Sequence, residues 1–140
     1  MKIGDVYQQT EHEIQCYCVE WMRWRYPNES RVFFAVPNGG KRSRKTAIDL
    51  KREGVLAGVS DFVLLVARKG YHFLCIEMKR KGGRQSDAQK AFSLAVAAFG
   101  GLYVLCYSSD DFCRVVDDYL KESKNKEEDK ENQRNASGRI

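Results

Sequence analysis

The stretch "GVSDFVLLVARKGYHFLCIEMKRKGG", Gly58 to Gly83, places charged side chains at the ends of two apolar segments. Both segments have the composition of β-strands, and the Lys-Gly pair between them is typical of a turn. Asp61 precedes the first apolar segment, whereas Glu77 and Lys79 lie at the end of the second. Because charged groups are seldom buried in a sheet without a partner, these three residues need an explanation.

The length of the turn decides whether the three charged side chains share one face of the sheet. Glu77 and Lys79 are two residues apart in a strand, so they point to the same face. A two-residue loop would place Asp61 on the opposite face, whereas a three-residue loop over residues 68–70 would place it opposite Glu77. We expect the three-residue loop, with Gly70 in the left-handed conformation that such a loop favours.

Two carboxylates held a few ångströms apart repel each other, and a divalent cation removes the conflict. Mg²⁺ or Mn²⁺ would be held by oxygens of Asp61 and Glu77, with the Met78 carbonyl as a further ligand. Such a cation makes a coordinated water more acidic, so that the water can attack phosphorus, and Lys79 could orient it or stabilise the developing charge. The alternative is an ordinary ion pair between Lys79 and one carboxylate, and these residues alone do not decide between the two.

Composition excludes several other kinds of protein. The chain has 140 residues, 43% of them hydrophobic and 31% charged, which suits one globular domain. It has no signal peptide and no apolar run of membrane-spanning length, so we expect a soluble intracellular protein. The five cysteines include no C-x-x-C pair and should be small buried hydrophobes, in preference to a site at His12, Cys16 and Cys18. With His72 the only other histidine, His-metal finger nucleases and Ser-His-Asp triads are disfavoured.

The chain has a net charge of +5, and the basic residues before residue 121 cluster in two places, "GGKRSRK" and "KRKGGR". Either cluster alone could be a solvated loop. Together, on both sides of the unusual carboxylates, they favour a polyanion such as nucleic acid. The residues expected to contact phosphates are Lys41, Arg42, Arg44, Lys45, Arg80, Lys81 and Arg84.

Periodicity and capping signals predict an α/β fold with a mixed central sheet flanked by helices. Glu11 lies near the edge of the first helix's apolar stripe, so it can point inward. Residues 121–140 are highly charged and should be a disordered tail. The expected elements are a helix from Glu11 to Tyr26 capped by Thr10, a strand over 31–36, a short basic helix over 44–53, the two strands of the quoted stretch, a helix with a Ser86–Gln89 capping box, a strand over 102–107, and a last helix capped by Ser108 or Ser109.

The segment "SDFVLL…FLCIEMKRKGG" resembles the D…E-x-K core of the PD-(D/E)XK nuclease superfamily, with Ser60 where the superfamily has proline. That change should reduce rigidity in the approach to Asp61. More narrowly, the chain resembles the VRR-NUC family, the virus-type replication-repair nucleases. The segments that carry this resemblance are "EHEIQ", "PNGGKR", "LKREGVLAGVSDFVLL", "IEMKRKGGRQSDAQ" and "YVLCYSSDDFCRVVDDYL".

The resemblance implies a restriction-endonuclease-like αβββαβ core in a nuclease domain over residues 1–120. It implies that Asp61 and Glu77 are metal ligands and that Lys79 is the catalytic lysine. Glu11 would be the first-helix acid that reaches the metal, and Gln89 would do more than cap its helix. Asn38, in "PNGGKR", joins the residues expected at the nucleic acid.

The resemblance also implies a function. The family includes a domain of a eukaryotic DNA-repair nuclease and compact stand-alone members from phages and bacteria, which act as homodimers on branched DNA. We therefore expect a Mg²⁺-dependent endodeoxyribonuclease, cytoplasmic in a phage-infected or bacterial cell, that resolves four-way (Holliday) junctions as a homodimer. Trp24 and Tyr26 are the candidate interface residues. The alternatives are a nuclease for flaps, nicks or single strands, and a non-catalytic module that binds DNA structures.

Overall fold

The computed structural model describes residues 8–37 and 43–121, together with Arg134. Apart from Lys121 and Arg134, the tail expected over 121–140 lies outside the described residues, as do Asn38, Lys41 and Arg42. The elements are α1 (Glu11–Arg25), a 3₁₀ turn (Glu29–Val32), β1 (Phe33–Ala35), α2 (Arg44–Arg52), β2 (Phe62–Leu64), β3 (Leu74–Met78), α3 (Asp87–Ala98), β4 (Leu102–Cys106) and α4 (Ser109–Leu120).

The four strands form one mixed sheet in the order β1-β2-β3-β4. The first three strands pair antiparallel, and β4 returns through α3 to pair parallel with β3. This confirms the predicted mixed α/β sheet. Because β3 and β4 run parallel, their carboxyl ends lie at the same edge of the sheet, and that edge carries the candidate site.

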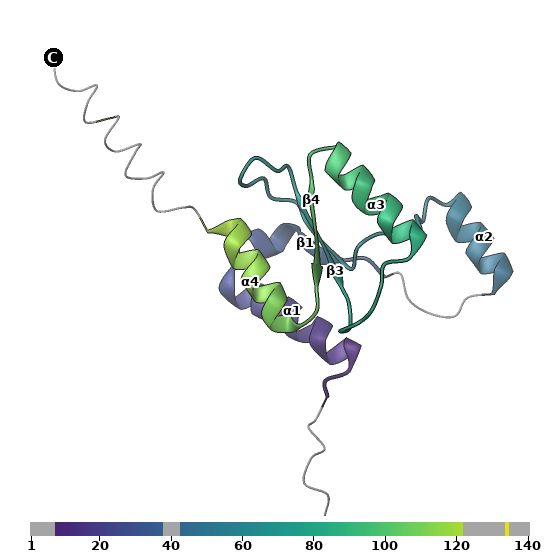
Figure 1. Ribbon diagram of the computed structural model, residues 1–140, viewed down its shortest axis with the longest axis horizontal. Helices are drawn as coiled ribbons and strands as arrows, with labels where there is room; N and C mark the ends of the chain where they lie inside the picture. Colours follow the sequence, from purple (N-terminus) through teal and green to yellow (C-terminus); the bar gives the residue numbers. More distant parts are fainter. Residues whose placement is uncertain (1–7, 38–42, 122–133, 135–140) are drawn as a thin grey trace, which may run out of the picture.

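Helices cover both faces of the sheet. In Figure 1, α1 and α4 lie together on one side of the strands and α3 lies on the other. The main core is on the α1/α4 side, where the Phe112 ring packs on Phe62 with centroids 5.4 Å apart. On the other side, Phe92 of α3 packs edge-on against Tyr103 of β4. The α3 face of the sheet also carries the buried Glu77, so polar chemistry sits on the side away from the main core.

The hairpin between β2 and β3 differs from the expected one. Arg68 pairs with Tyr71, so the loop has two residues, Lys69 and Gly70, and the three-residue prediction is wrong. Both loop residues have positive φ, 52° and 84°, as a type I′ turn requires. If the pairing set by this turn continued without interruption, Asp61 would lie on the face of the sheet opposite to Glu77.

An extra residue before the turn restores the expected register in the strands. Between the Leu64–Leu74 pair and the turn, residues 65–67 face only residues 72–73, so the first strand bulges by one residue. Phe62 consequently pairs with Ile76. Continued by one residue, that register sets Asp61 opposite Glu77, as expected, although by a different route.

The first helix follows its capping signals closely. The hydroxyl of Thr10 accepts a hydrogen bond from the N–H of Glu13, and the Glu13 carboxylate accepts one from the N–H of Thr10. Of the two suggested interface residues, Trp24 is 78% exposed. Tyr26 is not available, because its ring packs on Trp21 and its hydroxyl donates to Asp117 of α4.

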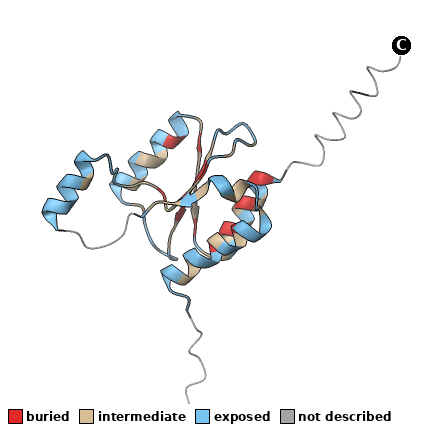
Figure 2. Cartoon of the chain, turned by 180° about the vertical axis from the view of Figure 1, so that it is seen from behind, coloured by how far each residue is buried: buried red, intermediate tan, exposed pale blue. Residues whose placement is uncertain are grey.

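The short helix α2 stands apart from the sheet. Its N-cap is Ser43, whose hydroxyl accepts from the N–H of Thr46, and none of its residues is buried. Figure 2 shows it as an almost wholly exposed helix beside the body. Ile48 of α2 and Val55 and Leu56 after it are exposed apolar residues.

Two further features concern the burial of the cysteines and the length of the helices. Cys18, Cys75 and Cys106 are buried, but Cys16 is exposed, so the prediction that all cysteines are buried is wrong there. The surface face of α1 leaves Cys16 in water beside His12, with Sγ and Nε2 3.5 Å apart. Within residues 8–37 and 43–121, no helix is long and apolar enough to span a membrane.

Candidate active site

Asp61 lies where the chain enters β2, and its side chain reaches across to β3. One carboxylate oxygen, Oδ2, accepts a hydrogen bond of 2.7 Å from the N–H of Met78. The approach is secured by Ser60, which is fully buried and donates its hydroxyl to the Phe62 carbonyl at 3.0 Å. This hydrogen bond restrains the backbone before Asp61, and so it offsets the loss of rigidity that we expected from serine in place of proline.

Glu77 is a buried carboxylate near the end of β3, only 4% exposed. Its Oε1 accepts a hydrogen bond of 3.0 Å from the Gln89 side chain and lies 3.6 Å from the Lys79 ammonium. Its Oε2 is buried and has no hydrogen-bond partner among the described residues. A buried carboxylate oxygen without a donor is energetically costly, so this atom is suited to a cation.

Gln89 links the catalytic candidates to α3. Its backbone N–H and side chain complete the capping box with Ser86, as predicted. Its Oε1 also accepts from the Lys79 ammonium at 2.8 Å, while its amide nitrogen donates to Glu77. One glutamine in the first turn of α3 therefore hydrogen-bonds to both Lys79 and Glu77.

The Asp61 charge disfavours the ionised form of Glu77, whereas a hydrogen bond with Glu77 lowers the pKa of Asp61. Burial and the nearby Asp61 charge raise the pKa of Glu77 to about 7, despite the opposing effect of Lys79. Burial also raises the pKa of Asp61, although the Met78 N–H and Lys79 stabilise its charge. With a pKa of about 7, the Glu77 carboxyl is partly protonated near neutral pH when no cation is bound.

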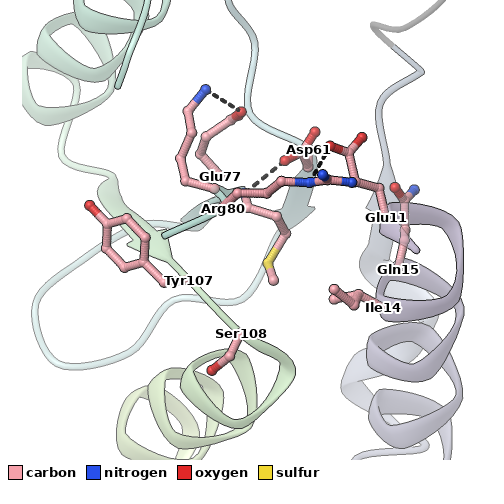
Figure 3. Close-up of a pocket in the computed structure, with 10 residues that line it drawn as sticks. Glu11, Ile14, Gln15, Asp61, Glu77, Arg80, Tyr107 and Ser108 are labelled. Atoms are coloured by element: carbon pink, nitrogen blue, oxygen red, sulfur yellow. Dashed lines mark hydrogen bonds and ion pairs between the residues drawn. The ribbon is translucent and has the colours of Figure 1, made fainter. Parts of the chain in front are cut away.

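Glu11 lines the cavity that contains Asp61 and Glu77, as expected, but at its exposed opening. It begins α1 and its side chain is 78% exposed, paired with the Arg80 guanidinium at 3.1 Å. Figure 3 shows Arg80 extending across the opening of the site towards Glu11. An ion pair this exposed is weak enough to exchange.

These side chains surround one cavity of about 320 Å³ at the carboxyl ends of β3 and β4. Tyr107 and Ser108, which follow β4, line it and were not identified from the sequence. The signal that could have identified them is the parallel pairing of β3 with β4, which sets residue 107 beside the E-x-K segment. The complete lining is Glu11, Ile14, Gln15, Asp61, Glu77, Met78, Lys79, Arg80, Tyr107 and Ser108.

Comparison with known proteins shows the family to which this fold belongs. The sequence pattern of the VRR-NUC domain family matches residues 2–110, most of the chain. The chain belongs to the VRR-NUC domain family. A solved structure described as a VRR_NUC domain protein is similar to the VRR-NUC domain described here, with a TM-score of 0.71 and 27% sequence identity over 82% of this chain and 91% of that one. No curated protein matches the sequence.

Family membership makes this chain a nuclease-like domain of the kind that processes DNA. The VRR-NUC match includes every candidate site residue, from Glu11 to Gln89. It also includes Tyr107, at the far wall of the cavity. The family and the cavity therefore coincide on the same part of the fold.

The residues of this VRR-NUC domain that were predicted to contact nucleic acid fall into three groups. Arg80 lines the cavity, whereas Lys81 and Arg84 are exposed in the turn between β3 and α3. Arg44 and Lys45 are exposed at the start of α2. The other three residues of the predicted nucleic-acid surface lie outside the described residues.

The residues present fit a divalent cation. Asp61 and Glu77 supply close carboxylates, and one of their oxygens is buried without a donor in the described part of the chain. Within that same part, no three acidic, histidine or cysteine side chains are already arranged to hold an ion. Two protein carboxylates are typical for Mg²⁺ in a phosphate-processing site, where waters and substrate phosphate supply other ligands.

Proposed function

We propose that this VRR-NUC domain is a metal-dependent endonuclease that hydrolyses phosphodiester bonds in branched DNA. The observation that carries the proposal is the buried Oε2 of Glu77, unpartnered among the described residues, beside Asp61 and Lys79. If Lys79 served only in a structural ion pair, its ammonium would be expected to contact the carboxylate alone. Here the ammonium is shared with Gln89, and the second oxygen of Glu77 remains available.

Asp61 and Glu77 would hold Mg²⁺ or Mn²⁺, with the Met78 carbonyl as an additional oxygen. When bound, the cation supplies Lewis-acid stabilisation of the charge at the scissile phosphate. Glu11 joins this set only if it leaves Arg80, and the exposure of their ion pair permits that exchange.

The protein's own groups then position the reaction. Lys79 lies beside Glu77 and is oriented by the Gln89 carbonyl, so its ammonium is placed to stabilise negative charge that grows on the phosphate. Arg80, once released, and the exposed Lys81 and Arg84 would contact neighbouring phosphates. Hydrolysis adds water across one P–O bond, and the leaving oxygen takes up a proton.

The non-catalytic DNA-binding module remains the second candidate, and the 3.6 Å approach of Lys79 to Glu77 is the observation that favours it. A structural ion pair would leave the basic surface to bind DNA without cleavage. Cleavage measurements separate the two.

The proposal is tested with supercoiled plasmid and a four-way junction in Mg²⁺, in Mn²⁺ and in EDTA. We expect cleavage only with a divalent cation, and a loss of roughly 100-fold or more in Asp61→Asn and in Glu77→Gln. DNA affinity should change little, because phosphate contacts supply most of it. Glu20→Gln, an exposed acid outside the cavity, is the matched control.

Full cleavage by either active-site variant would refute the site assignment. Binding without cleavage in every cation tested would establish the non-catalytic module instead.

A further inference from the structure

The cavity beside Asp61 and Glu77 has an aromatic wall that none of the roles above uses. Tyr107 follows β4, lines the cavity and is 47% exposed. Its backbone N–H donates to Asp111 of α4 at 3.0 Å, which holds the residue at the junction between strand and helix. Figure 3 shows Tyr107 at the rim of the site, on the side opposite Glu11, with its hydroxyl directed away from Asp61.

The lining of the cavity is divided by chemistry. Asp61, Glu77 and Lys79 supply charge, whereas Ile14 and Met78 supply apolar surface. A phosphate suits the first group, and a flat organic ring suits the apolar residues and the Tyr107 ring that line the same cavity. A nucleotide has both parts, joined through its sugar.

The size of the cavity limits what can enter it. Its volume of about 320 Å³ is at the lower end of the range for small-molecule sites, about 300–1,000 Å³. A base inside a duplex has both faces covered by its neighbours. Only an unpaired base, or one rotated out of the stack, can present a face to a tyrosine ring.

We propose that Tyr107 is a stacking platform for one unpaired or flipped base next to the scissile phosphate. This inference rests on the proposed nuclease function and narrows its substrate class. The preferred DNA then carries an unpaired or easily unpaired nucleotide at the cut site, as branch points and flaps do, and continuous duplex is disfavoured.

The test uses binding in EDTA, so that no cleavage occurs. The probes are a four-way junction and a flap with 2-aminopurine at successive positions around the branch, and a matched continuous duplex. Stacking on tyrosine should quench the analogue at one position. Tyr107→Ala should abolish that quenching and lower the affinity for branched DNA by roughly 5- to 150-fold, the effect of losing one base–aromatic stack. Affinity for the duplex should change by less than about twofold, because it depends on phosphate contacts.

Three variants give the comparison. Tyr107→Phe keeps the ring and should restore the quenching, whereas Tyr107→Leu keeps apolar area without a ring and should not. Tyr17→Ala removes a tyrosine that is 44% exposed on α1 and does not line the cavity, so it should leave quenching intact. Thermal unfolding of each variant shows that the folded protein is being compared.

Unchanged quenching in Tyr107→Ala, or equal losses on duplex and branched DNA, would overturn the inference. Restoration by Tyr107→Leu would overturn the stacking role as well. Because the assay needs no cleavage, its result is independent of the metal-dependent reaction, and failure of cleavage in wild type would refute the nuclease proposal separately.

Discussion

Glu77 should make the stability of the cation-free protein depend on pH. Its pKa is raised from 4.5 to about 7 in the folded protein, so the folded state binds its proton more tightly than the unfolded state does. The associated stability is fully present below pH 4.5 and is lost as the pH rises through about 7. We expect the free energy of unfolding to fall over this interval by up to about 3 kcal/mol, measured by urea denaturation in EDTA.

Glu77→Gln is the control for this effect, because glutamine does not titrate. The free energy of unfolding of wild type, relative to that of Glu77→Gln, should decrease, or even change sign, as the pH rises. Adding Mg²⁺ at pH 8 should stabilise wild type and not the variant, since only wild type has the second carboxylate. A difference between the two proteins that is constant with pH and unaffected by Mg²⁺ would contradict the assignment.

The first turn of α3 is the element that determines the position of Gln89, and Gly58 packs directly against it. Gly58 has φ +84°, and a Cβ there would lie 2.4 Å from the carbonyl carbon and oxygen of Ala88. Gly58→Ala should therefore displace the helix start. We expect destabilisation of about 3 kcal/mol, from left-handed strain and overpacking together. Cleavage should fall at least about tenfold more than DNA affinity, because Gln89 loses its alignment with Glu77 and Lys79.

Gly54→Ala separates strain from the steric clash. Gly54 also has positive φ, +100°, but a Cβ there meets no atom within 4 Å. The Gly54→Ala protein should be destabilised by about 1 kcal/mol, and its ratio of cleavage rate to DNA affinity should equal that of wild type. If Gly58→Ala and Gly54→Ala changed the ratio of cleavage to DNA affinity equally, contact of Gly58 with α3 would not be what aligns the site.

As a whole molecule, the protein is proposed to act as a homodimer, because two opposed nicks in a four-way junction require two active sites in a two-fold relation. The apolar surface of Ile48, Val55 and Leu56 at α2 is our preferred interface, since α2 has no buried residue of its own. Sedimentation at micromolar concentration should show a dimer for wild type. Leu56→Asp should dissociate it and abolish paired incision of junctions while retaining single nicks.

Trp24→Asp tests the other exposed candidate surface, on α1. A dimer that survives Leu56→Asp and dissociates in Trp24→Asp would move the interface to α1. A strict monomer that cuts flaps and leaves four-way junctions intact would refute the junction-resolving function and leave the nuclease function standing.

Local patterns predicted most elements of this fold and singled out the acidic residues that line its candidate site. The Ser86–Gln89 capping box and the Thr10 cap depend on neighbours three residues away, so they could be recognised directly. The alternation that places Glu77 and Lys79 on one face is likewise a property of one strand. Such patterns involve residues close together in the sequence, so they can be recognised before the tertiary structure is known.

Other features depended on contacts between segments distant in the sequence. The bulge that restores the register of Asp61, the attraction of Glu11 to Arg80 and the burial of Tyr26 against Asp117 each involve a partner from another element. The position of Tyr107 depends on parallel pairing of β4 with β3. Nothing in the local sequence specifies these partners, because each is chosen by the packing of the whole chain, which decides which surfaces are buried and which charges meet.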